Sequence, residues 1–345
     1  MKQIRILILD DEEDVRKAYI RAIERFNSEE KEEFLYYEVK CLEEALETIK
    51  EIRFDAAIVD LNLNKTEKST EGNQAIKSLI ENFRMPIFVI SAYLDGLEDL
   101  YKNTPLITSL TKGQIKTQDL LKEIVKELHS HVMQFYARNG FLEKQINDFY
   151  WNHLSHTFES WEKLSEDIPK NELDVIISRH TLIGINEELN KISPKYHYAE
   201  TYIIPSIKEI PHTGNILELS GEYYINLTPS CDIAEKAKLG KLSSFSLLKI
   251  ESVYNLDIVK SKTTEEKKQL YIRDTLKRNQ AERYHYLPPF NFMLESVIDF
   301  QSITNVKEDE ISNYNSKASI TIQFLKDIQN RYSSYLGRQG QPNYL

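Results

Sequence analysis

The chain has 345 residues, of which 41% are hydrophobic and 28% are charged, and its formal net charge at pH 7 is −10. Because a single core rarely grows past about 250 residues, we expect two or three domains of a soluble globular protein. The acidic balance does not indicate binding to nucleic acid, and no segment approaches the ~20 apolar residues of a membrane span. The two distant cysteines suit a reducing, cytoplasmic setting.

Strand and helix patterns alternate through residues 1–120. Short apolar runs, typical of strands buried on both faces, are followed by segments with helical spacing. The expected strands are 4–9, 34–39, 56–61, 86–91 and 106–110, and the expected helices are 15–26, 42–49, 72–82, 97–102 and 120–135, the last capped by Thr117. Five such units predict an α/β domain with a doubly wound parallel sheet.

Polar residues gather at the carboxyl ends of these strands. Asp10 and Asp11 close the first strand in ILILDDEEDV, and Asp60 closes the third in IVDLNL. Ser91 closes the fourth strand in IFVISAY, and Lys112 follows the fifth in TSLTKG. Ligands of open α/β sheets bind at this edge. Carboxylates that meet there repel each other unless a cation lies among them, and oxygen ligands of this kind suit Mg²⁺.

Each of these residues also has an ordinary explanation. Acids after a strand can cap the next helix or face its dipole, a reading that suits Glu12, Glu13 and Asp14, and turns favour aspartate and serine. The coincidence of all the polar residues at one edge instead favours a site. Asp60 would act there as a nucleophile toward a phosphoryl donor, while Lys112 and a cation hold the phosphoryl oxygens.

The order and placement of these motifs resemble the receiver domain of two-component response regulators, over about the first third of the chain. The resemblance implies a flavodoxin-like fold and a phosphoacceptor aspartate that receives its phosphoryl group from a histidine kinase or other phosphodonor, with Mg²⁺ bound. It implies these site residues: Asp60 as phosphoacceptor; Asp10, Asp11, Asp60 and Asn62 (through its carbonyl) as metal ligands; Ser91 and Lys112 as phosphate contacts.

Residues 121–200 are expected to form a helical linker or bundle, with helices at 141–164 and 172–189. At the start of this part, apolar residues alternate by four and three, a short heptad seam. The seam is compatible with a coil in a homodimer and with a helix that packs on its own sheet, and the second interpretation is favoured for Leu121 to Leu128. The seam consists of Leu121, Val125, Leu128, Val132 and Phe135.

Residues 201–345 are expected to form an α+β output domain, for which a small barrel with a helical insertion is one form. Strand patterns occupy most of 201–256 and 283–306, and helices are expected near 264–279 and 320–336. The segments LTPSCDIAEK, RYHYLP and FLKDIQNRYSSYLGRQG resemble the C-terminal regions of uncharacterised bacterial proteins. That resemblance implies no activity.

One catalytic arrangement in the output domain is considered. Cys231, beside Asp232, could act as a nucleophile with His285 as its base. The alternative is a small buried cysteine next to a capping aspartate, and the sequence favours it.

The whole sequence is interpreted as a response-regulator-like signalling protein, in which phosphorylation of Asp60 controls the output domain. For the output we consider a protein interaction module, an effector enzyme such as a hydrolase or nuclease, and transcriptional control. The last is the weakest, because no helix-turn-helix with a basic recognition helix is evident. The alternative is a receiver-like docking domain that is never phosphorylated, fused to an effector enzyme.

Overall fold

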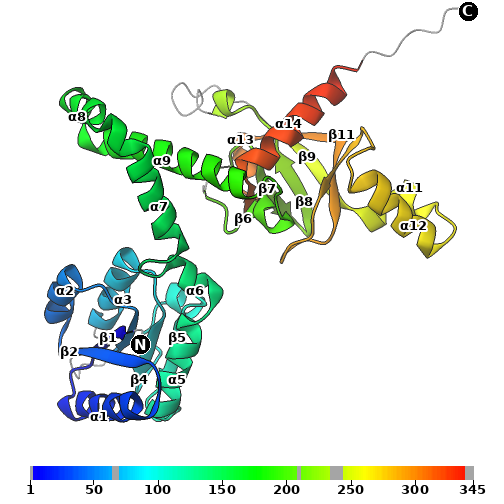
Figure 1. Ribbon diagram of the computed structural model, residues 1–345. Helices are drawn as coiled ribbons and strands as arrows, with labels where there is room; N and C mark the ends of the chain where they lie inside the picture. The colour runs from blue at the N-terminus through cyan, green and yellow to red at the C-terminus, as the bar shows by residue number, and fades with distance from the viewer. Residues whose placement is uncertain (1–2, 64–69, 208–210, 234–243, 339–345) are drawn as a thin grey trace, which may run out of the picture. The chain divides into compact units, whose positions relative to one another are not determined.

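The computed structural model describes residues 3–63, 70–207, 211–233 and 244–338, and the chain divides into two compact units, Met1–Ile192 and Ser193–Leu345 (Figure 1). The helices between residues 120 and 192 belong to the first unit. The division into three parts at 120 and 200 stays a prediction. Among the described residues, no helix is long and apolar enough to cross a membrane.

The first unit contains a five-stranded sheet in which all neighbouring strands are parallel. Its strand order is β2-β1-β3-β4-β5, the flavodoxin-like order of a doubly wound fold. The predicted fold class is therefore confirmed for this part of the chain. The strands are β1 (Gln3–Leu9), β2 (Glu33–Val39), β3 (Ala56–Val59), β4 (Ile87–Ser91) and β5 (Ile107–Thr111).

Helices cover both faces of this sheet, which explains why its inner strands β3 and β4 are buried throughout and almost wholly apolar (Figure 1). In β1, Leu7 and Leu9 join the core under α2 and α3, while Ile6 and Ile8 join the core under α1 and α5. The helices are α1 (Glu13–Glu29), α2 (Leu42–Glu51), α3 (Glu71–Asn82), α4 (Asp99–Lys102) and α5 (Thr117–Leu128).

The prediction of a single helix over 120–135 is wrong, because the helix α5 ends at Leu128. A second helix, α6 (His131–Tyr136), begins after Ser130, whose side chain caps it by accepting a hydrogen bond from the Met133 backbone N–H. The heptad seam is therefore interrupted. Its first half packs on the sheet, as favoured from the sequence, whereas Val132 on α6 is exposed.

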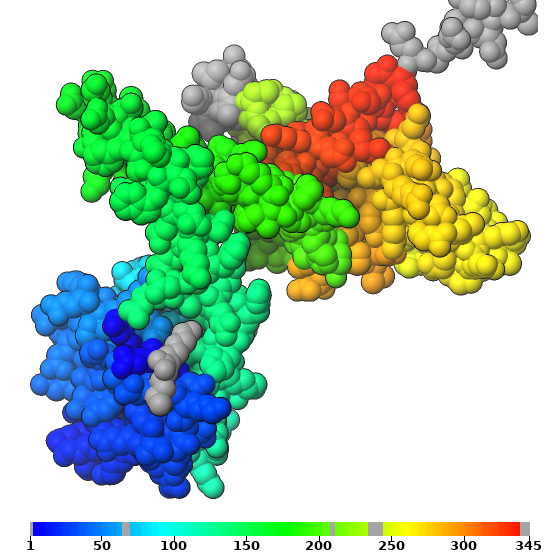
Figure 2. Space-filling view, in the orientation of Figure 1, coloured from blue at the N-terminus to red at the C-terminus, as the bar shows by residue number. Residues whose placement is uncertain are grey.

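The first unit ends in three helices, green in the space-filling view (Figure 2). They are α7 (Phe141–Asn152), α8 (Phe158–Asp167) and α9 (Lys170–Ile192), with a 3₁₀ turn, η1 (Leu154–Thr157), between the first two. The helix predicted over 141–164 is therefore broken at this turn. α9 approaches α7 closely at Gly184, where an added Cβ would lie 1.9 Å from Cε2 of Phe149.

The second unit is built on a seven-stranded sheet whose pairings are all antiparallel, in the order β10-β11-β9-β8-β7-β12-β6. The α+β expectation is confirmed. Within the described ranges, β10 and β6 do not pair with each other, so the sheet is open rather than a barrel. The strands are β6 (Tyr202–Ile203), β7 (Asn215–Leu219), β8 (Glu222–Asn226), β9 (Ser244–Ser252), β10 (Tyr284–Leu287), β11 (Ser296–Lys307) and β12 (Asn315–Ile320).

One face of this sheet packs against the last helix, α14 (Ile322–Leu336), through Leu325 and Ile328. The opposite side of β11 contributes Val297 to a smaller core with the helices that follow β9. The remaining short elements are η2 (Tyr198–Thr201), η3 (Val253–Asn255), α11 (Asp257–Lys260), α12 (Glu265–Tyr271), the π turn η4 (Ile272–Leu276) and α13 (Glu308–Ile311).

Candidate functional site

The register of the parallel sheet brings two aspartates side by side. Leu9 at the end of β1 pairs with Val59 at the end of β3, so Asp10 and Asp60 leave neighbouring strands at the same level. The Asp60 backbone N–H donates to the Leu9 carbonyl at 2.8 Å, which continues the ladder by one residue. Both aspartates are buried, with only 2% and 4% of their surface exposed.

Each of the two carboxylates is oriented by its own turn, and the two turns are of the same kind. Oδ1 of Asp10 accepts a hydrogen bond from the Glu12 backbone N–H at 2.9 Å, and Oδ1 of Asp60 accepts one from the Asn62 N–H at 3.0 Å. An aspartate that binds the backbone two residues ahead has a fixed carboxylate plane. The second oxygen of each carboxylate is therefore directed into one shared space.

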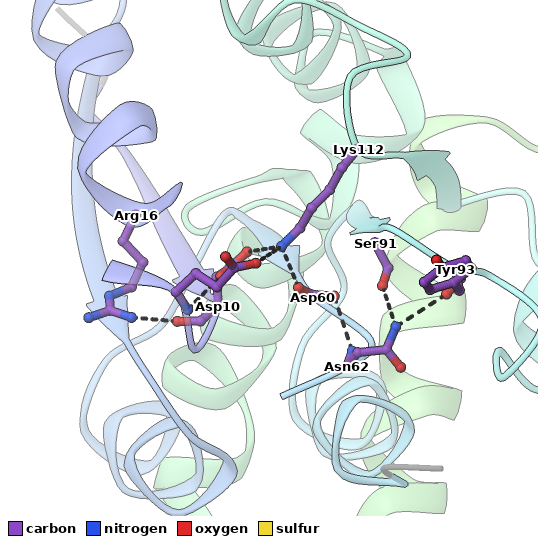
Figure 3. A network of polar contacts seen from close by, with 8 residues as sticks. Asp10, Arg16, Asp60, Asn62, Ser91, Tyr93 and Lys112 are labelled. Atoms are coloured by element: carbon purple, nitrogen blue, oxygen red, sulfur yellow. Dashed lines mark hydrogen bonds and ion pairs between the residues drawn. The ribbon is translucent and has the colours of Figure 1, made fainter. Parts of the chain in front are cut away.

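Lys112 fills that space from the end of β5 (Figure 3). Its Nζ lies 2.7 Å from Oδ2 of Asp60, 3.1 Å from Oδ2 of Asp10 and 3.1 Å from Oε1 of Glu12. Burial lowers the pKa of Lys112, but the hydrogen bond and charge of Asp60, with those of Asp10, outweigh burial and raise it. Burial also raises the pKa of Asp10, because its charged form loses water.

Ser91 lies at the same edge, fully buried at the end of β4. The Asn62 side chain donates from Nδ2 to Oγ of Ser91 at 2.9 Å and to the Tyr93 carbonyl at 3.5 Å (Figure 3). Asn62 therefore connects the turn that holds Asp60 to the end of β4. The hydroxyl predicted from the sequence lies in the network that surrounds the carboxylates.

The structure gathers most of the predicted residues, with one difference among the acids. Carboxylate oxygens of Asp10, Glu12 and Asp60 lie within 4.8 Å of one another, whereas Asp11 is half-buried and outside this cluster. Glu12 was interpreted only as a helix-start acid. The signal that could have revealed it is the turn at Asp10, which brings the residue two positions ahead toward the site. A set of three carboxylates fits a small hard cation.

The structure does not bring the predicted output-domain residues together. His285 in β10 pairs with Ile298, Ile298 with Ile250, and Ile250 with Tyr223 near the start of β8. Cys231 instead follows the far end of β8, and three strand spacings of ~4.8 Å each separate β10 from β8. The prediction that His285 acts as the base for Cys231 is therefore corrected, because the structure places the two residues apart in the sheet.

The surroundings of these residues also differ from those of a nucleophile and its base. Cys231 is exposed rather than buried, and its Sγ donates to Oδ1 of Asp232 at 3.5 Å. His285 is 5% exposed, and burial, with the nearby charge of Arg331, lowers its pKa to about 3.

Comparisons with known proteins bear on the first unit. No family model matches the chain, and no curated protein matches it either. Among solved structures, it is similar to a response regulator receiver protein from Sinorhizobium medicae, with 20% identity and a TM-score of 0.30, over 37% of this chain and 97% of that one. A CheY-like receiver domain protein from Methanospirillum hungatei has 23% identity and a TM-score of 0.29, over 37% and 94%. A sensor protein from Polaromonas sp. has 24% identity and a TM-score of 0.29, over 36% and 94%.

These likenesses concern the fold alone. They cover the part of the chain whose strand order and parallel pairing already define a flavodoxin-like sheet. The flavodoxin-like fold of the first third rests on this strand order and parallel pairing. The chemistry of the site has to be argued from its residues.

Close packing behind Asp60 gives a first prediction. An added Cβ at Gly72 in α3 would lie 2.4 Å from the carbonyl oxygen of Leu61 and 2.6 Å from its Cα. Because this obstacle is backbone, Gly72→Ala should displace the residue next to Asp60 and lower the free energy of unfolding by about 1–3 kcal/mol, as overpacking does. Urea denaturation measures this. Gly96→Ala is the control, since its Cβ would lie 3.7 Å from Leu61 Cδ2, an ordinary contact. Equal stabilities of the two variants would contradict the prediction.

Proposed function

We propose that the first unit is a phosphoacceptor receiver, in which Asp60 accepts a phosphoryl group from a histidine kinase or other phosphodonor with Mg²⁺ bound. The phosphorylation state of Asp60 would control the second unit. The observation that carries this proposal is the pair of buried carboxylates, Asp10 and Asp60, converging on the Lys112 ammonium at the strand edge. An ion pair with a purely structural role needs only one carboxylate for the Lys112 ammonium. The second buried carboxylate leaves a net negative charge at the site, and phosphoryl transfer would use that charge to hold a cation.

The proposed reaction follows from the positions of the side chains. A carboxylate oxygen of Asp60 attacks the phosphorus atom, so a new P–O bond forms while the bond from phosphorus to the donor breaks and its electron pair leaves with the donor. The Asn62 N–H holds the other oxygen of Asp60 and fixes the direction of attack. The Lys112 ammonium, now paired with Asp60, would move to the phosphoryl oxygens, with the Ser91 hydroxyl nearby.

Mg²⁺ would be held by the carboxylates of Asp10, Glu12 and Asp60, with the Asn62 carbonyl as a further ligand. Asp11, next to Asp10 in the chain, stays a predicted ligand. The cation supplies positive charge that offsets the charge on the phosphoryl oxygens.

Lys112 would connect phosphorylation of Asp60 to the rest of the chain. Its backbone N–H donates to the Ser91 carbonyl at 2.9 Å, and α5 begins five residues later at Thr117. A lysine that leaves Asp60 for a phosphoryl group would bias the turn between β5 and α5. The output stays open between an interaction module, an effector enzyme and transcriptional control.

Intact-mass spectrometry of the full chain after incubation with acetyl phosphate and Mg²⁺ tests the proposal. We expect a mass increase of one phosphoryl group that does not form when Mg²⁺ is chelated before the incubation and is absent in Asp60→Asn. Asp14→Asn is the matched control, since Asp14 is an exposed acid of the same segment outside the cluster, and it should behave as the unchanged chain does. A wild-type chain that takes up no phosphoryl group would contradict the proposal and favour the docking alternative.

A further inference from the structure

The first unit has a cavity at the edge of its sheet opposite to the Asp60 site. The lining includes Ile4 at the start of β1 and Phe54 just before β3, so the cavity lies at the amino ends of the strands. It also includes residues of α6 and of the loop that follows it. The volume is about 430 Å³, within the range of ~300–1,000 Å³ that is typical of small-molecule sites.

Basic side chains from separate segments line this cavity. They are Lys50 in the last turn of α2, Arg53 in the loop after α2, Arg84 in the loop after α3, and Arg138 in the loop after α6. The dipole of α2 favours a cation at Lys50. It does not account for the three arginines, which lie beyond the last turns of their helices. Because like charges repel, their convergence in a chain of net charge −10 favours an anion between them.

The carboxylates of the lining mostly have other partners. The acids of the lining are Glu32, Glu51 and Asp55. Asp55 accepts a hydrogen bond from the Arg5 backbone N–H at 2.9 Å, and Oε1 of Glu32 lies 3.6 Å from Nε2 of His129. Within the described residues, this leaves Glu51 as the one acid of the lining without such a contact.

One carboxylate of the chain already shows what the arginines attract. Glu143 of α7 lies outside the lining, with its Oε1 3.1 Å from Nη1 of Arg53. The Asn139 backbone N–H, and after it Arg53 and Arg84, hold the pKa of Glu143 below its usual range. The arginines at this edge of the sheet therefore stabilise anionic oxygens, and Glu143 engages only Arg53 directly.

The remaining cations are accompanied by aromatic rings. In the described part of the chain, Lys50, Arg84 and Arg138 make no hydrogen bond with other side chains or with the backbone. Half-buried Phe83 precedes Arg84, and Tyr136, which is 39% exposed, lies two residues before Arg138. Both rings belong to the lining. Guanidinium groups match phosphate oxygens, and planar rings pack against aromatic side chains.

We propose that this cavity binds a phosphorylated small molecule with a planar ring, of the size of a mononucleotide. Arg84 and Arg138 would hold the phosphate, while Phe83 and Tyr136 would pack against the ring. The inference goes beyond the proposed phosphoacceptor function and does not depend on it, since the cavity shares no residue with the Asp60 site.

The position of the cavity suggests what binding would do. Arg84 follows a helix that covers the sheet, whereas Arg138 follows α6, so a ligand held by both would join these two parts of the first unit. A ligand that binds one arrangement of α6 better than another shifts the chain toward it. The helices after α5 would then respond to a second input, apart from phosphorylation of Asp60.

Isothermal titration calorimetry of the full chain with each of the four ribonucleoside 5′-monophosphates, in buffer without divalent cations, tests the site. We expect at least one of them to bind with one-to-one stoichiometry and a dissociation constant below about 1 mM. Arg84→Gln and Arg138→Gln should each weaken this binding at least about tenfold, because a charge-assisted hydrogen bond to the phosphate is lost. The nucleoside without its phosphate, and inorganic phosphate without the ring, should also bind more weakly.

Arg21→Gln is the matched control, since Arg21 is an exposed arginine of α1 outside the cavity, and it should bind as the unchanged chain does. Circular dichroism checks that the variants keep their helices. A chain that binds none of the four nucleotides would overturn the proposal. Binding that survives in both Arg84→Gln and Arg138→Gln would also overturn it, because the nucleotide would then occupy another site. Inorganic phosphate that binds as tightly as the nucleotide would overturn the role of the rings.

Discussion

Lys112→Met should lower the free energy of unfolding of the first unit by about 2–4 kcal/mol at neutral pH in buffer without divalent cations. Methionine keeps an unbranched apolar chain but removes the ammonium that Asp10, Glu12 and Asp60 share. Two of these carboxylates are buried and would face each other unpaired, which costs more than the loss of an exposed ion pair. Because the pKa of Lys112 is raised above its ordinary value of 10.5, this stabilisation is fully present at neutral pH and would be lost only as the pH rises above 10.5.

The same variant should respond strongly to Mg²⁺. With the ammonium gone, the carboxylates bind a divalent cation more tightly, and a ligand that binds only the folded state stabilises it. Urea unfolding followed by the fluorescence of Trp151 and Trp161, both in the first unit, measures this with and without Mg²⁺. Lys116→Met, an exposed lysine of the same segment, is the matched control and should change little in either buffer. If Mg²⁺ does not stabilise Lys112→Met, the acidic cluster is not a cation site.

The receiver-like part of the fold was predictable because its signals are local. Strands buried on both faces are apolar throughout, and parallel pairing places the residue after each strand at one edge. Asp10, Asp60, Ser91 and Lys112 could therefore be located from strand ends alone. Glu12 could not, because its place in the cluster depends on a turn formed by the Asp10 side chain.

The break in the helix after Leu128 was missed for a similar reason. Helical spacing continues through Ser130, but this serine can cap a new helix as well as continue the old one. The difference lies in one hydrogen bond to the Met133 N–H, which the apolar pattern does not record.

The second unit was harder because its sheet joins strands that are distant in sequence. β12 was not predicted, since NSKASI has few apolar residues, yet it lies between β7 and β6. Its small side chains fit a position next to buried polar residues, where Asn215 donates from Nδ2 to Oγ of Ser316 at 3.0 Å. The strand order also decides that His285 and Cys231 lie apart, and local patterns do not contain that order.

His285 itself should give the second unit a marked acid sensitivity. It is buried on the face of the sheet covered by α14, with Nδ1 3.9 Å from Oδ2 of Asp327 and without a hydrogen-bond partner among the described residues. Burial first, and then the charge of Arg331, lowers its pKa from 6.5 to about 3. Between these two values the unfolded chain binds a proton that the folded chain does not. Stability therefore falls as the pH falls below 6.5, by at most about 1.4 kcal/mol per pH unit.

Between pH 7 and pH 5 the second unit of the wild-type chain should lose about 2 kcal/mol through this residue, and His285→Gln should not. The measurement is hydrogen exchange of the β11 amides, which reports this unit alone, at both pH values after correction for the intrinsic exchange rate. The neutral amide of glutamine has no proton to gain in this range, so the variant can be less stable at pH 7 and still lose less on acidification. His197→Gln is the control, because His197 is exposed and its replacement should leave the pH dependence as it is. A His285→Gln chain that loses as much stability as the wild type would mean that His285 is protonated inside the folded unit, with Asp327 close enough to hold the charge.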